Sequence, residues 1–217
     1  MICISGFLSA DSTQSQDWVH LVNFCRVRGL PLYSVRWESK KTGDLGAIIA
    51  KHAAEPLVTG LVGGLDGYVV PIATAVGSVA KEGVDAFKTA RSNAKTTGKM
   101  LAHFLASDRN LPDNILGDQT FSLVGFSLGS QVVKSTINRL SKLGQPALIH
   151  NAYFLAGATY VKKQKLDLQK ELFMSVVNGR LFNVHTENDT TLGTLFQPIY
   201  GEEALGRNIY YATDKHN

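Results

Sequence analysis

A serine between two glycines, Gly-Phe-Ser-Leu-Gly at 125–129, constrains the fold more than any other segment of the chain. An apolar, β-prone run at 120–124 precedes it, and a helical pattern follows at 130–143. A strand, a sharp turn and a helix are the context of a nucleophile elbow, in which the serine takes a strained backbone conformation. The flanking glycines remove Cβ atoms that would collide with the adjoining strand and helix. The sequence therefore predicts that Ser127 presents its Oγ at the edge of a sheet.

Other β-prone runs alternate with helical patterns along the chain. We expect strands at 1–5, 32–37, 121–124, 147–156, 180–185 and 208–212, and a first helix around Trp18 to Cys25. Such alternation is typical of parallel strands joined by right-handed crossovers. The sequence predicts an α/β fold of the α/β-hydrolase type, with a mainly parallel sheet of about six strands and helices on both faces. A strand order of 2-1-3-4-5-6 would put the ligand-binding switch point between strands one and three.

A long insert, about 43–107, separates the second strand from the nucleophile strand. It is rich in Ala, Gly and Val, with helical patterns near 45–54, 72–79 and 84–106. Two interpretations stay open: a helical lid that offers apolar surface to a substrate, or ordinary helices that cover the sheet. Its apolar stretch is shorter than the ~20 residues that a spanning helix needs. With 217 residues in the chain, we expect a single domain, 1–217, that includes this insert.

Composition and charge argue against several classes of protein. The formal net charge is +4 and the basic residues are scattered, which does not favour nucleic-acid binding. Cys3 and Cys25 have no C-x-x-C spacing and no histidine cluster beside them, so we expect reduced core thiols. The N-terminus does not follow the pattern of a secretory signal, which favours an intracellular setting. No cofactor and no metal is implied.

Acyl transfer by a serine needs a base, a carboxylate that orients the base, and N–H donors for the oxyanion. In α/β-hydrolases the order along the chain is Ser, then Asp or Glu, then His, at the ends of successive strands. Asp189 follows the fifth predicted strand and His216 the sixth, so these two complete the predicted triad. Asp189 could instead cap the next helix, and Glu187 is its nearest competitor.

The base and the oxyanion hole each have alternatives. His216 is favoured because the other five histidines precede the last strand, yet it is the penultimate residue, and chain ends are commonly disordered. His185 and His20 are the next candidates. The backbone N–H groups of Leu128 and Phe7 are the predicted oxyanion donors, although Gly6 beside Phe7 could serve only as a turn residue.

Four segments together resemble the α/β-hydrolase domain of the transmembrane and coiled-coil domain 4 family, a eukaryotic group described as lipase- or esterase-like. They are Ser-Gly-Phe-Leu-Ser at 5–9, Tyr-Ser-Val-Arg-Trp-Glu at 33–38, Val-Gly-Phe-Ser-Leu-Gly at 124–129 and Asn-Val-His-Thr-Glu-Asn-Asp at 183–189. The resemblance implies Ser127 as nucleophile, Asp189 as acid and His216 as base. That family usually has glycine before this histidine, where Lys215 stands here, and a membrane-associated region ahead of the domain.

These observations predict a serine hydrolase that acts on ester bonds of a small-molecule ester or lipid with an apolar acyl group. Peripheral membrane contact is part of this expectation, and protein partners are not indicated. One alternative is a catalytically idle hydrolase-fold protein that serves as a scaffold or a subunit of an assembly, because a fold does not determine a function. Another is a thioesterase or peptidase that uses the same elbow.

Overall fold

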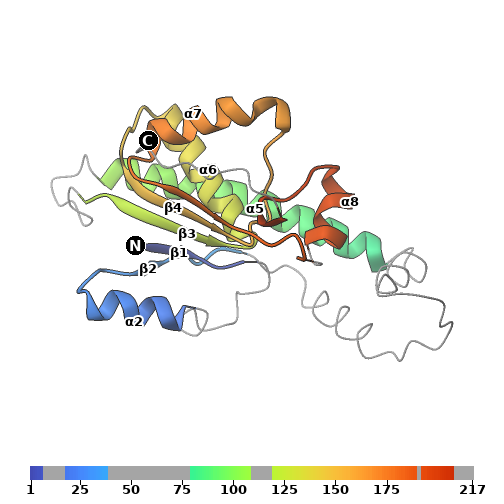
Figure 1. Cartoon of the computed structure of the whole chain (residues 1–217), viewed down its shortest axis with the longest axis horizontal. Helices are drawn as coiled ribbons and strands as arrows, with labels where there is room; N and C mark the ends of the chain where they lie inside the picture. The colour runs from blue at the N-terminus through green and yellow to red at the C-terminus, as the bar shows by residue number, and fades with distance from the viewer. Residues whose placement is uncertain (7–17, 39–78, 109–118, 190–191, 208–217) are drawn as a thin grey trace.

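The structure is a computed structural model that describes residues 1–6, 18–38, 79–108, 119–189 and 192–207 (Figure 1). Its centre is a sheet of five strands: β1 (Ile2–Ile4), β2 (Tyr33–Ser34), β3 (Phe121–Phe126), β4 (Ile149–Leu155) and β5 (Leu181–Val184). All neighbouring strands pair in parallel, in the order β2-β1-β3-β4-β5. This order confirms the prediction for the first five strands. The predicted sixth strand, 208–212, lies outside the described residues.

Helices cover both faces of the sheet. One face carries α2 (Val19–Val27), and the other carries α5 (Val79–Asp108), α6 (Gly129–Lys142) and α7 (Leu166–Val176) (Figure 1). The molecule therefore has an α/β fold of three layers, as the alternation of patterns indicates. In the part of the chain that the structure describes, no helix is both long enough and apolar enough to cross a bilayer.

The end of the predicted insert belongs to the core. Its last helical pattern forms α5, whose buried residues include Ala94, Ala102 and Leu105. A Cβ added to Gly98 would lie 2.5 Å from the Val132 carbonyl oxygen of α6, so the two helices cross almost backbone to backbone. This part of the insert thus packs against α6 and helps to cover the sheet. The lid interpretation of 43–78 falls on residues outside the described part of the chain.

The topology places two strand ends side by side. β1 lies between β2 and β3, and Ile4 of β1 is in register with Gly125 of β3. After β1 the chain forms β2, on one side of β1. It forms β3, on the other side of β1, only after the long insert. This reversal is the switch point of an open parallel sheet, where the loops after the two strands diverge and leave room for a ligand. Gly6 and Ser127 both lie at this point.

Candidate active site

Ser127 occupies a sharp turn between β3 and α6. Its φ is 50°, in the left-handed region that residues with a side chain rarely adopt. The next residue, Leu128, is the N-cap of α6 and is fully buried. The serine is half-buried at the carboxyl edge of the sheet and at the N-terminal end of a helix, where backbone N–H groups carry a partial positive charge.

The two glycines of the motif are required by close backbone contacts. A Cβ on Gly125 would lie 2.7 Å from both the Gly129 carbonyl oxygen and the Ser130 nitrogen. A Cβ on Gly129 would lie 2.1 Å from the Ile4 carbonyl oxygen. The first glycine lets the helix fold back against its own strand, and the second lets that helix approach β1. The spacing of the motif is thus explained by the turn itself.

Gly6 faces the serine from the neighbouring strand end. A Cβ at this position would lie 2.8 Å from the Ser127 Cβ and 3.4 Å from its Oγ. The absence of a side chain here leaves room beside the hydroxyl, so Gly6 does more than permit a turn. The predicted donor Phe7 follows immediately but lies outside the described residues. Leu128, the other predicted donor, is the N-cap residue of α6 and precedes the first hydrogen-bonded turn of that helix.

Both tryptophans of the chain fix the end of β1. Trp18 donates from Nε1 to the Ser5 Oγ at 2.9 Å, and Trp37 donates from Nε1 to the Ser5 carbonyl oxygen at 3.0 Å. Ser5 is buried and precedes Gly6. Two indole rings, one from the N-cap of α2 and one from the segment after β2, therefore hold the backbone that leads into the predicted oxyanion loop.

The loop after β4 also supports the elbow, and the sequence analysis did not find it. The Ser127 N–H donates to the Leu155 carbonyl oxygen at 2.8 Å, and the Ser127 carbonyl oxygen accepts from the Ala158 N–H at 2.9 Å. Between them Ala156 has a φ of 45°, a second strained residue at this edge of the sheet. The available signal was a run of small residues, Ala-Gly-Ala-Thr at 156–159, directly after a predicted strand.

Buried hydrogen bonds connect this loop to α6. Thr159 donates from Oγ1 to Gln131 Oε1 at 2.9 Å, and Gln131 donates from Nε2 to Ser135 Oγ at 2.9 Å. Ser130 donates from Oγ to the Gly125 carbonyl oxygen at 2.9 Å. Satisfied polar groups inside the protein make such a region rigid. The backbone on both sides of Ser127 is thus held by specific bonds.

Asp189 lies in the loop after β5. Its Oδ1 accepts a hydrogen bond of 2.8 Å from the Leu192 N–H, at the start of the π-helix η3 (Leu192–Phe196). This is the capping geometry that the sequence offered as an alternative. The competitor Glu187 is exposed, and its carbonyl oxygen accepts bonds of 3.1 and 2.8 Å from the Arg207 guanidinium. Both carboxylates follow β5, at the same edge of the sheet as Ser127.

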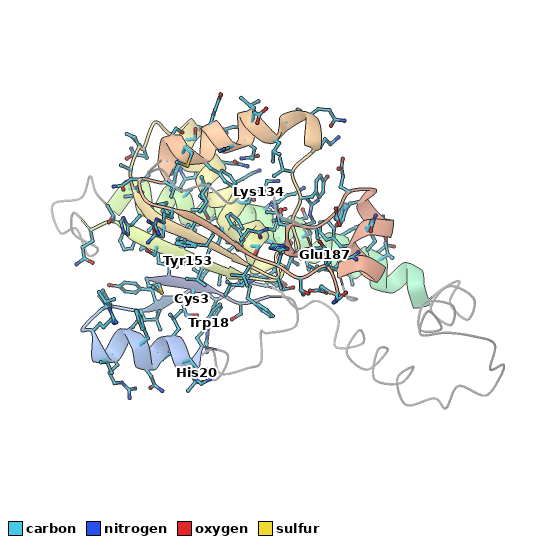
Figure 2. The ribbon with its side chains drawn as sticks, in the orientation of Figure 1. Cys3, Trp18, His20, Lys134, Tyr153 and Glu187 are labelled. Carbon is cyan, nitrogen blue, oxygen red and sulfur yellow. The ribbon has the colours of Figure 1, made fainter. Side chains whose placement is uncertain are left out.

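The histidines that the structure describes are spread over the molecule. His20 is exposed on α2, across the sheet from Lys134 of α6 (Figure 2). His103 accepts a hydrogen bond of 3.0 Å from Arg139 Nε. Within the described residues no hydrogen bond joins a histidine to Ser127 or Asp189, and His216 lies outside this part of the chain.

The two cysteines are buried free thiols, which confirms the expectation of reduced core cysteines. Burial raises the pKa of the Cys3 thiol to about 12. A thiol with such a pKa is protonated at neutral pH and is a poor nucleophile. Among the described residues, no three His, Cys, Asp or Glu side chains gather where they could hold a metal ion.

A comparison with protein families matches residues 1–204 to a family described as "Protein of unknown function (DUF726)". The chain belongs to the DUF726 family. The chain is also similar to the probable lipase MIL1 of Saccharomyces cerevisiae, with 30% identity over 179 residues that cover 78% of this chain and 16% of that protein.

The names of two other similar proteins describe them as membrane or transmembrane proteins. The uncharacterized membrane protein F35D11.3 of Caenorhabditis elegans is 26% identical over 91% of this chain and 32% of its own length. The transmembrane and coiled-coil domain-containing protein STS1 of Oryza sativa subsp. japonica is 26% identical over 90% of this chain and 29% of its own length. This DUF726 chain thus spans about a sixth to a third of the length of these relatives. No solved structure matches it.

Proposed function

We propose that this chain is a serine hydrolase of the α/β-hydrolase type that cleaves ester bonds with Ser127 as its nucleophile. The observation that carries the proposal is the φ of 50° at Ser127, between a central strand and the start of a helix. Strained residues other than glycine cost about 1–3 kcal/mol and cluster at functional sites.

In the proposed reaction the Ser127 Oγ attacks the carbonyl carbon of the ester while the base removes the hydroxyl proton. The carbonyl oxygen becomes an oxyanion, which the N–H groups of Leu128 and Phe7 stabilise. The intermediate collapses to an acyl-serine, and the base returns its proton to the departing alcohol. In the second half, water attacks the carbonyl carbon of the acyl-serine and loses its proton to the base. The acid leaves as the base returns that proton to the Ser127 Oγ.

Asp189 and His216 are the proposed partners of the serine. Asp189 uses Oδ1 to cap η3, and a carboxylate has a second oxygen that can accept from a histidine N–H. The capping bond would then hold the carboxylate in a fixed orientation, which is what an orienting acid requires. His216 is assigned by its position beyond the sixth predicted strand, 208–212, and by the resemblance to the transmembrane and coiled-coil domain 4 family.

The proposed substrates are lipids or other apolar acyl esters, and membrane association is part of the proposal. The lipase name of the yeast relative and the membrane names of the worm and rice relatives support both points. An acyl ester needs no cofactor and no metal for hydrolysis by a serine.

A scaffold role is the second candidate. One observation favours it: the described geometry of Asp189 is that of a helix cap, and this role needs no histidine. An idle elbow retained for its packing would keep Gly125 and Gly129 and would tolerate loss of the hydroxyl.

Hydrolysis of a short activated ester separates the two candidates. Replacing Ser127 by Ala should lower turnover by a factor on the order of 10³ or more, because removal of a nucleophile leaves only residual catalysis. Ser141→Ala, a change of the same size near the C-terminal end of α6, should leave turnover unchanged. Equal turnover of the Ser127→Ala variant and the wild type would refute the hydrolase proposal.

A further inference from the structure

Three basic residues gather beside the candidate active site. Arg91 and Lys95 are one turn apart on α5. Lys134, which is labelled in Figure 2, lies in the second turn of α6. Arg91 is only 7% exposed, and Lys134 is partly buried. We call these three residues the basic cluster. The charges that act most on the pKa values of Lys134 and Lys95 are those of neighbouring basic residues, and they lower both values.

Aromatic rings surround the cluster. The Arg91 guanidinium carbon lies 4.3 Å from the ring centre of Tyr200 and 4.8 Å from that of Tyr160. Phe196 is 5.9 Å away, and the Lys134 Nζ is 5.5 Å from the Tyr160 ring. Such contacts stabilise a cation, but they bring no negative charge to offset the repulsion between neighbouring cations.

The polar groups of the cluster are incompletely satisfied. Among the residues that the structure describes, the buried Nε of Arg91 has no hydrogen-bond partner. Lys134 donates to the Tyr160 carbonyl oxygen. Burial lowers the pKa of Lys134 to about 8, and the nearby charges of Arg91 and then Lys95 act in the same direction. Buried charges are normally paired, so an anion bound here would stabilise this arrangement.

We propose that Arg91 and Lys134, with Lys95 at the rim, bind a phosphate group. The cluster carries three positive charges, so a phosphate monoester with a charge near −2 balances it better than a carboxylate does. A guanidinium and an ammonium are also the side-chain groups that proteins use to hold phosphates. Lys134, Tyr160 and Tyr200 are all partly exposed, so the group can enter along this flank.

The binding region adjoins the elbow. Tyr160 comes two residues after Ala158, whose N–H binds the Ser127 carbonyl oxygen. Lys134 is about 8 Å along α6 from the start of that helix, given a rise of about 1.5 Å per residue. The phosphate could belong to a soluble ester or to a lipid headgroup. The inference rests on the basic cluster alone and does not require ester hydrolysis.

Thermal unfolding with sodium phosphate, against sodium chloride at equal ionic strength, tests the proposal. With phosphate at about ten times its dissociation constant, we expect the Tm of the wild type to rise by about 3–6 °C. Lys134→Met should lose this shift, Lys134→Arg should keep most of it, and Lys88→Met, a charge loss at an exposed site on α5, should keep all of it. An equal shift in Lys134→Met, or none in the wild type, would overturn the proposal.

Vesicle flotation distinguishes the two sources of phosphate. If the group is a lipid headgroup, phosphatidylcholine vesicles with phosphatidic acid should carry the wild type, and Lys134→Met should float less. A Tm shift without such flotation assigns the site to a soluble phosphate ester. Flotation that is equal in the wild type and Lys134→Met, without any Tm shift, counts against the basic cluster as a phosphate site.

Discussion

At the residue scale, Ser127 combines a reactive side chain with a backbone conformation that suits glycine. Its N–H and its carbonyl oxygen are held by Leu155 and Ala158, so the surroundings impose the φ of 50°. Strain of this kind is maintained only where neighbouring structure specifies it. Gly6 adds a second requirement, because any side chain there would contact the serine.

The strain at Ser127 can be measured as a difference in stability. Ser127→Gly relieves the positive φ, whereas Ser127→Ala keeps it, so we expect the glycine variant to be the more stable by about 1 kcal/mol in urea unfolding. Ala147 has a φ of 57° in an exposed turn, and Ala147→Gly supplies the matched control. We expect Ala147→Gly to be more stable than the wild type. If it is, and Ser127→Gly is no more stable than Ser127→Ala, then the backbone at Ser127 is unstrained.

The lowered pKa of Lys134 predicts how the stability of the protein depends on pH. Its pKa is lowered from 10.5 to about 8 in the folded protein, chiefly by burial, so the unfolded chain binds more protons between these two values. Stability attributable to Lys134 therefore rises with pH across this window and is at its lowest below pH 8. Arg91 and Lys95 from α5 are the nearby charges, and the rings of Tyr160 and Tyr200 lie against Arg91.

Lys134→Met removes this proton-binding difference. We expect the stability of the variant relative to wild type to fall by about 1–3 kcal/mol as pH rises from 7 to 10, after allowance for the partial exposure of the lysine. Urea unfolding of both proteins at several pH values measures the change. A stability difference that is independent of pH would mean that Lys134 has an ordinary pKa.

At the element scale, sequence patterns predicted the strands and helices that neighbouring residues in the chain determine. The strands β1, β3, β4 and β5 and the helix α6 were found because apolar periodicity and the glycines at 125 and 129 reflect local burial and the turn. The loop at 156–159 and the basic cluster were missed because partners distant in sequence create them. Arg91 meets Tyr160 and Tyr200 only after three elements have packed together.

A single methyl group added at Gly129, where α6 contacts β1, should destabilise the protein. Gly129→Ala would place a Cβ 2.1 Å from the Ile4 carbonyl oxygen, and backbone on both sides would have to move. We expect a loss of roughly 3 kcal/mol or more in the free energy of unfolding. Gly144→Ala is the control, because its φ is 63° but nothing lies within 4 Å of its added Cβ, so only about 1 kcal/mol should be lost. Equal losses would contradict the close contact.

At the scale of the whole molecule, the sheet order brings the proposed parts to one edge. Gly6, Ser127, Ala158 and Asp189 follow β1, β3, β4 and β5 in turn, so parallel strands place all four on the same side. The order of Ser before Asp along the chain is that of α/β-hydrolases. The sequence predicted this arrangement through its alternation of elements. It predicted Phe7 by position, and His216 by position and by the family resemblance, and both lie outside the described residues.

Labelling with a fluorophosphonate probe tests the central proposal most directly. We expect a single adduct on Ser127, mapped by mass spectrometry, that is absent from Ser127→Ala and retained in Ser141→Ala. A chain without residues 216–217 should fold and lose the adduct almost completely, because His216 is the proposed base. Full labelling of the trimmed chain would assign the base to another histidine. A folded wild-type chain without an adduct on Ser127 would contradict the proposal that this elbow is catalytic.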